Sequence, residues 1–138
     1  TRLKKLNTKT LPIKTTNTMN FEEKLNHGFE LLQDKDIDHA LDIARELQKE
    51  NDKSPEAFYL EALIMQQLNQ YDLSMQNITK ALALDAENAA YYNLRGSIYM
   101  QKEELENAEA DFNKAGTYYE QALNIDPEND YARRQLEE

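Results

Sequence analysis

The sequence AAYYNLRGSIYMQKEELENAEADFNKAGTYYEQALNIDPEN, residues 89–129, predicts two amphipathic helices joined by a tight turn. Tyr92, Gly96 and Tyr99 recur at spacings of four and three residues, so they share one face of the first helix. A glycine inside a helix costs roughly 1 kcal/mol relative to alanine. We therefore expect Gly96 to lie where a neighbouring helix approaches too closely for a side chain to fit.

The second helix of this stretch alternates large and small apolar residues at heptad spacing: Leu105, Ala108, Phe112, Ala115, Tyr119 and Ala122. Pro127 ends it, because the residue before a proline avoids helical geometry. We favour one continuous helix over residues 105–125, roughly 30 Å long at 1.5 Å per residue. The alternative is a break at Gly116 and a new helix that starts with a capping box of Thr117 and Glu120.

The same pattern recurs twice upstream, and each copy begins 34 residues before the next one. Residues 55–88 align with the third copy so that Ala62 falls on Gly96 and Ile78 falls on Phe112, and residues 21–54 align so that Gly28 falls on Ala62. Small residues meet small residues in both shifts, which predicts three copies of one structural unit. A single helical hairpin cannot bury both of its faces, so we expect the copies to stack.

This unit resembles the tetratricopeptide repeat, which places an aromatic residue, Leu-Gly, Tyr, Ala, Phe, Ala and Pro at set positions in a unit of about 34 residues. The third copy matches best, at Tyr92, Gly96, Tyr99, Ala108, Phe112, Ala115 or Ala122, and Pro127. The resemblance implies an all-α fold: a right-handed α-solenoid of three helix-turn-helix units plus a short C-terminal capping helix. The units are residues 21–54, 55–88 and 89–129, and the cap is residues 130–138.

The third unit has seven more residues than the other two, all in its second helix. Seven residues are nearly two helical turns, so the apolar seam stays in phase, and we expect the added turns to protrude beyond the stack. Along the whole chain, helices are predicted at about residues 20–33, 37–50, 55–68, 71–84, 89–102, 105–125 and 128–136. The last one carries Tyr131, Ala132 and Leu136 on one side, as a partial cap needs.

Charge separates the first residues from the rest of the chain. Residues 1–20 carry five cationic side chains and no acidic one, whereas the whole chain has a net charge of −10, so residues 21–138 carry −15. We expect residues 1–19 to be a basic, Thr-rich, disordered leader that extends upstream of a natural start at Met19. The acidic body argues against nucleic acid as a ligand. A membrane could be contacted only through residues 1–18.

No signal peptide or membrane span is visible, and the chain has no cysteine. The sequence favours a cytoplasmic protein, with a periplasmic or membrane-associated location as the alternative. Neither His27 nor His39 has the further donors of a metal site, and the segment that starts at Asp34 lacks the Gly and Glu of a calcium loop. We therefore expect no catalytic residue, no metal and no cofactor.

The resemblance places the binding surface on the first helices of the units, which line a concave groove for a peptide or helix in such proteins. The matching residues here are Phe29, Gln33, Tyr59, Leu63, Gln66, Gln67, Asn93, Ser97, Met100 and Gln101, with Leu25, Leu32 and Glu56 beside them. They include no Lys or Arg, which suits a partly apolar segment whose backbone the amides hold. The alternative for Leu25, Phe29 and Leu63 is packing between helices.

Relatives that hold acidic chaperone tails use cationic and amide side chains where this chain has Leu25, Phe29, Leu60, Ala90 and Leu94. None of these can bind a carboxylate, so we expect a protein or peptide partner that is not such a tail. We predict a non-catalytic interaction scaffold. The first alternative is a self-associating module that forms a homo-oligomer through the long third-unit helix and the C-terminal end, and the second is the soluble part of a membrane-attached assembly factor.

Overall fold

The computed structural model describes residues 18–137, and in this part of the chain every regular element is a helix. The helices are α2 (Phe21–Gln33), α3 (Ile37–Glu50), α4 (Pro55–Gln67), α5 (Tyr71–Leu84), α6 (Ala89–Gln101), α7 (Leu105–Ile125) and α8 (Asp130–Glu137). Their bounds agree closely with the predicted ones. The expected basic leader falls almost entirely outside the described residues.

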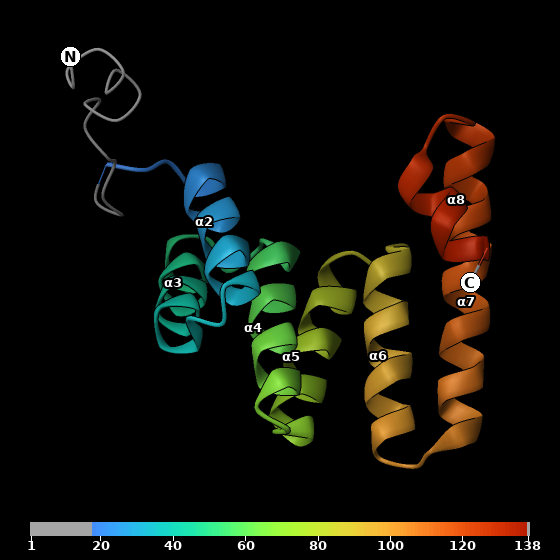
Figure 1. Ribbon diagram of the computed structural model, residues 1–138, viewed down its shortest axis with the longest axis horizontal. Coiled ribbons are helices and arrows are strands. Elements are labelled where there is room, and N and C mark those ends of the chain that lie inside the picture. Colours follow the sequence, from blue (N-terminus) through green and yellow to red (C-terminus); the bar gives the residue numbers. More distant parts are fainter. Residues whose placement is uncertain (1–17, 138) are drawn as a thin grey trace, which may run out of the picture.

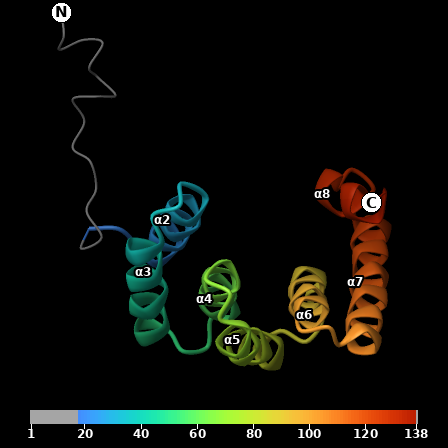
Figure 2. The same ribbon diagram turned by 60° about the horizontal axis from the view of Figure 1, so that its bottom comes forward.

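The helices follow one another along an arc (Figure 1). Three hairpins, α2 with α3, α4 with α5 and α6 with α7, stack so that α3 contacts α4 and α5 contacts α6. The first helices of successive hairpins also touch, α2 with α4 and α4 with α6. Figure 2 shows α2, α4, α6 and α8 along the concave side of the arc and α3, α5 and α7 along its outer side. The predicted all-α solenoid is confirmed.

The turn inside each hairpin repeats with the same backbone geometry. Lys35, Asn69 and Glu103 all have positive φ, at 67°, 60° and 63°, and they occupy equivalent positions in the three units. The backbone N–H of the following residue donates to a carbonyl oxygen in the last turn of the preceding helix, as Gln70 N–H does to Met65 O at 2.8 Å. This is the left-handed closure that satisfies the last carbonyl groups of a helix.

The second helix of the third unit is continuous, as predicted. α7 has 21 residues, whereas α3 and α5 have 14 each. The alternative break at Gly116 is wrong: the Thr117 hydroxyl does not cap a new helix and instead donates to the carbonyl oxygen of Asn113 at 3.1 Å. At 1.5 Å per residue, seven extra residues move the end of α7 by about 10 Å. α8 packs against that end, and within the described residues none of its Cα atoms lies within 8 Å of a Cα atom of α6 (Figure 1).

The close helix approach expected at Gly96 is present. A Cβ built there would lie 2.9 Å from the ring of Phe112 on α7, and one built at Gly28 would lie 2.6 Å from Leu60 on α4. Polar groups are also used in the interior: the hydroxyl of Ser74 donates to the carbonyl oxygen of Ala62 at 2.6 Å. Small residues therefore set the spacing between the helices, and the core fills around them.

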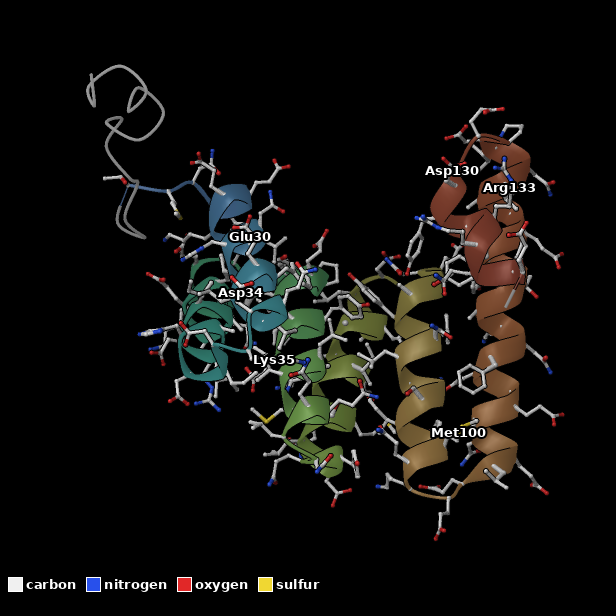
Figure 3. All side chains as sticks on the ribbon, in the orientation of Figure 1. Glu30, Asp34, Lys35, Met100, Asp130 and Arg133 are labelled. Atoms are coloured by element: carbon white, nitrogen blue, oxygen red, sulfur yellow. The ribbon has the colours of Figure 1, made fainter. Side chains whose placement is uncertain are left out.

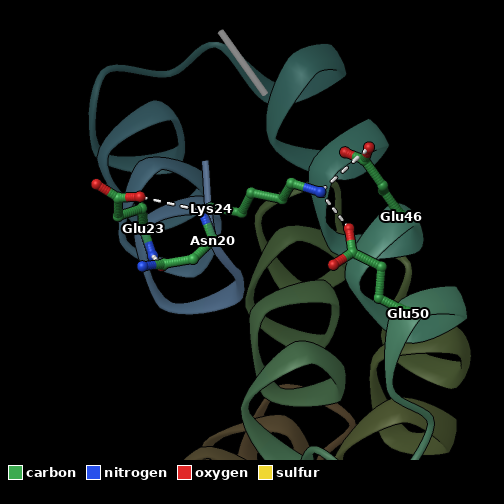
Figure 4. A network of polar contacts seen from close by, with 5 residues as sticks. All are labelled: Asn20, Glu23, Lys24, Glu46 and Glu50. Carbon is green, nitrogen blue, oxygen red and sulfur yellow. Dashed lines mark hydrogen bonds and ion pairs between the residues drawn. The ribbon is translucent and has the colours of Figure 1, made fainter. Parts of the chain in front are cut away.

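Lys24 stands where the repeat usually has an aromatic residue, and its side chain is only 10% exposed. Figure 4 shows its ammonium group between Glu46, at 3.7 Å, and Glu50, both on α3. The hydrogen bond to Glu50 is the main reason why the pKa of Lys24 lies above its ordinary value. Just before it, Asn20 and Glu23 form a capping box at the start of α2.

Across residues 18–137, no helix has both the length and the apolar content that a bilayer crossing requires.

Candidate functional site

The concave side of the arc carries a row of aromatic rings that crosses the three hairpins. Phe29 on α2 lies 6.1 Å from Tyr59 on α4, and Tyr59 lies 4.9 Å from Tyr91 on α6, measured between ring centroids. Tilted pairs at these distances stabilise each other beyond the apolar area that they bury. We call Phe29, Tyr59 and Tyr91 the aromatic row. Tyr91 was not among the predicted groove residues.

Burial governs the chemistry of these phenols. It raises the pKa of Tyr59 to about 12, and the nearby hydroxyl of Tyr131 on α8 is the second cause. The pKa of Tyr91 is also raised, first by burial and then by the charges of Glu56 and Asp85. Both phenols are neutral at physiological pH. Tyr59 is half-buried, whereas Tyr91 is only 3% exposed and belongs to the core beneath it. The effect of Tyr131 on Tyr59 also places α8 near the same side of the arc.

The amide groups predicted to line the groove differ in how free they are. Gln66 Nε2 on α4 donates to Ser97 Oγ at 3.0 Å and to Gln101 Oε1 at 2.9 Å, both on α6. These three side chains join two units to each other. Asn93 and Gln67, in contrast, make no side-chain hydrogen bond to a described residue. The free amides are therefore fewer than the sequence implied.

The predicted groove residues also differ in how exposed their side chains are. Leu25, Phe29 and Leu63 are partly buried and pack against the core, which is the alternative stated for them. Met100 is 51% exposed on α6, where Figure 3 labels it. Gln33, Gln67 and Gln101 are exposed, whereas Tyr59, Gln66, Asn93 and Ser97 are half-buried. The three helices on the concave side thus carry partly buried apolar side chains together with exposed amides.

The two cationic side chains of α2, α4 and α6 are both held in ion pairs. In α2, α4 and α6 the Lys and Arg residues are Lys24 and Arg95. Lys24 binds carboxylates on α3, and Arg95 forms a two-pronged pair with Asp111 on α7, at 2.7 and 2.9 Å. That pair is the main reason why the pKa of Arg95 is raised. No cation of these three helices is left to bind an anionic ligand.

The two histidines lie near each other at the N-terminal end of the arc. A pocket of about 330 Å³ between α2 and α3 is lined by His27, Leu31, His39, Asp42, Ile43 and Glu46. His39 Nδ1 lies 2.8 Å from Asp36, and His27 Nδ1 lies 3.9 Å from Glu30, each pair on or next to its own helix. Within the described residues, no three His, Asp or Glu side chains converge so as to hold a metal ion.

A second concave feature was not predicted in detail. A pocket of about 250 Å³ lies between α6, α7 and α8, and we call it the extension pocket; its lining is Asn93, Phe112, Ala115, Gly116, Tyr119 and Gln135. The expectation that the added turns of α7 protrude beyond the stack was the available signal. Gln135 could not be assigned from the sequence, because its neighbours depend on where α8 packs.

Comparison with known proteins agrees with this architecture. A model of the family described as tetratricopeptide repeat matches residues 55–88, 89–116 and 111–129. The last two matches overlap inside α7, as expected for a helix in which the repeat's second-helix pattern occurs twice. A TPR repeat-containing protein of Methanocaldococcus jannaschii is 25% identical over 116 residues, which are 84% of this chain but only 19% of that protein. The chain thus spans about a fifth of that relative.

Solved structures with the same fold include two that hold peptides. The Yersinia enterocolitica type III secretion chaperone SycD, in complex with a peptide of the translocator YopD, superposes with a TM-score of 0.70 at 18% identity. The match covers 89% of this chain and 92% of SycD. The second TPR of Spaghetti (RPAP3), bound to an HSP90 peptide, has a TM-score of 0.65 at 15% identity, over 72% of this chain and 92% of that one.

The sequence identities to these two structures are low, so the similarity supports the fold and nothing about the ligand. The family model, however, matches more than half of the sequence, and its matches coincide with the second and third hairpins. The chain therefore belongs to the tetratricopeptide repeat family.

Proposed function

We propose that this protein is a non-catalytic interaction scaffold whose concave face, on α2, α4 and α6, binds a peptide or helical segment of another protein. The observation that carries the proposal is the half-buried pair Phe29 and Tyr59, which the buried Tyr91 supports, beside exposed amides and without a free cation on these helices. Such a surface suits a segment with aliphatic or aromatic side chains and an uncharged or basic character. Two proteins of the same fold hold peptides, which supports this class of ligand.

An acidic chaperone tail is a poor candidate. The HSP90 peptide in the RPAP3 structure has the sequence SRMEEVD, with three carboxylate side chains. In this chain Leu60 and Leu94 are buried, and Leu25 and Phe29 pack against the core. No cation is available in their place, and an overall charge of −15 on residues 21–138 repels an anionic peptide. We expect HSP90-type tails not to bind.

The proposal is tested with a displayed library of random peptides, selected on the full chain. Selected peptides should be neutral or basic and should contain apolar residues. Met100→Lys replaces a 51% exposed apolar side chain on the concave side and should weaken their binding about tenfold.

The matched control is Leu73→Lys, which makes the same change at a 43% exposed position on the outer helix α5 and should leave binding unchanged. Equal losses in both variants, or selected peptides that are mostly acidic, would contradict the concave face as the binding surface. An SRMEEVD peptide serves as the negative ligand. Tight binding of that peptide would contradict the exclusion of acidic tails.

A further inference from the structure

The extension of α7 leaves open a space that regular stacking fills elsewhere in the arc. Cα atoms of α2 and α4, and of α4 and α6, approach each other within 8 Å, but within the described residues no Cα atom of α8 lies that close to one of α6. The extension pocket lies in this interval. A further pocket of about 250 Å³ lies on the other side of Tyr119, between the start of α6 and the start of α8. The interval between α6 and α8 thus holds two pockets, and Tyr119 lines both.

One wall of the extension pocket is a single face of α7. Phe112, Gly116 and Tyr119 follow at spacings of four and three residues, so they lie side by side along the helix. A Cβ built at Gly116 would meet no atom within 4 Å, whereas one at Gly96 would meet the Phe112 ring at 2.9 Å. Gly116 therefore borders open space between two aromatic rings, and a side chain from another molecule could enter there.

Two amides face the same space from the other walls. Asn93 comes from α6 and Gln135 from α8, and both are half-buried. Neither makes a side-chain hydrogen bond to a described residue, unlike Gln66, whose amide is bound by Ser97 and Gln101. Each amide carries a donor and an acceptor, which is the pair of functions that the backbone of a bound segment requires.

The lining also limits which side chain can enter. It contains no ionisable group except the phenol of Tyr119, and its apolar surface comes from Phe112, Ala115, Gly116 and Tyr119. A volume of about 250 Å³ exceeds the roughly 150 Å³ of an engineered apolar cavity that binds benzene. The volume is therefore sufficient for a phenyl ring, and rings favour contact with other rings in offset or edge-on geometry.

From these observations we infer that the extension pocket takes an uncharged aromatic side chain of a bound segment, while Asn93 and Gln135 hold its backbone. The inference rests on the proposed function, since it assigns one subsite to the segment on the concave face. It gives the seven-residue extension of α7 a role: the extension converts the contact between α6 and the next helix into a specificity pocket.

The test uses N-acetyl-phenylalaninamide as the probe and the full ¹⁵N-labelled chain as the target. Saturable shifts of the Asn93 and Gln135 side-chain amides in NMR spectra are expected, with N-acetyl-glycinamide and N-acetyl-lysinamide causing none. Gly116→Leu should fill the pocket and weaken the probe's binding about tenfold. Gly116→Ala is the matched control and should bind the probe nearly as well as the natural chain.

The helical circular dichroism signal establishes whether each variant is folded. If Gly116→Leu does not fold, Asn93→Leu replaces it as the variant that should weaken binding of the probe. The inference is overturned if the probe causes no saturable shift, or if its shifts survive in the filled variant. Its failure is distinguishable from that of the proposed function. Selected library peptides could lose affinity in Met100→Lys, lack an aromatic residue and bind Gly116→Leu unchanged. That result would support the concave face as the binding surface and contradict the role of the extension pocket.

Discussion

At the scale of single residues, the three glycines of the chain lie in helices but meet different surroundings. Gly28 and Gly96 face neighbouring helices at distances that a Cβ could not keep, whereas Gly116 faces open space. The same substitution should therefore change stability in opposite directions at these sites.

We expect Gly116→Ala to stabilise the protein by about 0.5–1 kcal/mol, because alanine is the better helix former. Gly96→Ala and Gly28→Ala should destabilise it by about 1–3 kcal/mol, because the added methyl group overpacks Phe112 or Leu60. Urea unfolding of the three variants measures both signs. A destabilising Gly116→Ala would show that the space beside α7 is filled.

His39 predicts a pH dependence at the same scale. A hydrogen bond to Asp36 raises the pKa of His39 above its ordinary value, with the charges of Asp36, Asp42 and Asp38 as further causes. Because the folded pKa is the higher one, this stabilisation is fully present below the unfolded pKa of about 6.5. It is lost as the pH rises through the folded value.

The stability difference between the natural chain and His39→Gln should therefore shrink between mildly acidic and alkaline pH. Urea unfolding at several pH values measures this difference, and an NMR titration of the His39 ring gives the folded pKa directly. In an Asp36→Asn background the His39→Gln difference should depend on pH much less, since only the charges of Asp42 and Asp38 remain. A difference that grows with pH would contradict the assigned direction.

At the scale of elements, the three hairpin turns share one backbone conformation but use different residues. Asn tolerates positive φ better than Lys or Glu, which pay a steric cost in that region. Only one turn, at Asn69, thus has a residue suited to it.

Glu103→Gly should stabilise the protein by about 0.5–1 kcal/mol, since relief of the steric cost exceeds the entropy that glycine adds to the unfolded chain. Lys35→Gly should act in the same direction. Asn69→Gly is the control and should change the free energy of unfolding much less. Thermal melting compares the three variants, and a larger gain at Asn69 than at Glu103 would contradict the argument.

At the scale of the whole molecule, the length of α7 decides how the last helix is placed. Deletion of residues 112–118 would remove one heptad and make the third unit as long as the other two. The seam would stay in phase, because seven residues are nearly two turns. Asp111 and its pair with Arg95 would remain, and Tyr119 would take the place of Phe112 beside Gly96.

We expect this deletion variant to fold cooperatively, with α8 now packed against α6 as α4 packs against α2. Within the described residues the backbone of α8 packs closely against α7 alone, so its amide hydrogens should exchange faster in the natural chain than in the variant. Hydrogen exchange measures this, with α4 as the internal reference. Loss of helical structure, or an unchanged exchange rate in α8, would contradict the view that the extension holds α8 away from α6.

The sequence alone determined the parts of this protein that depend on local order. Helix periodicity, the spacing of small residues and the constant interval between the copies predicted the hairpins, their register and the unbroken α7, because these follow from neighbours within a few turns. The absence of Lys and Arg from the predicted groove lining was also visible without coordinates.

Only the tertiary structure decided which side chains are free. Gln66 binds Ser97 from 31 residues away, Lys24 binds Glu50 from 26 away, and Arg95 binds Asp111 from 16 away. The extension pocket likewise exists because α8 packs on the far end of α7. A sequence pattern describes which face a residue occupies on its own helix, whereas a contact also depends on the position and angle of a second helix, and that is settled when the whole stack packs.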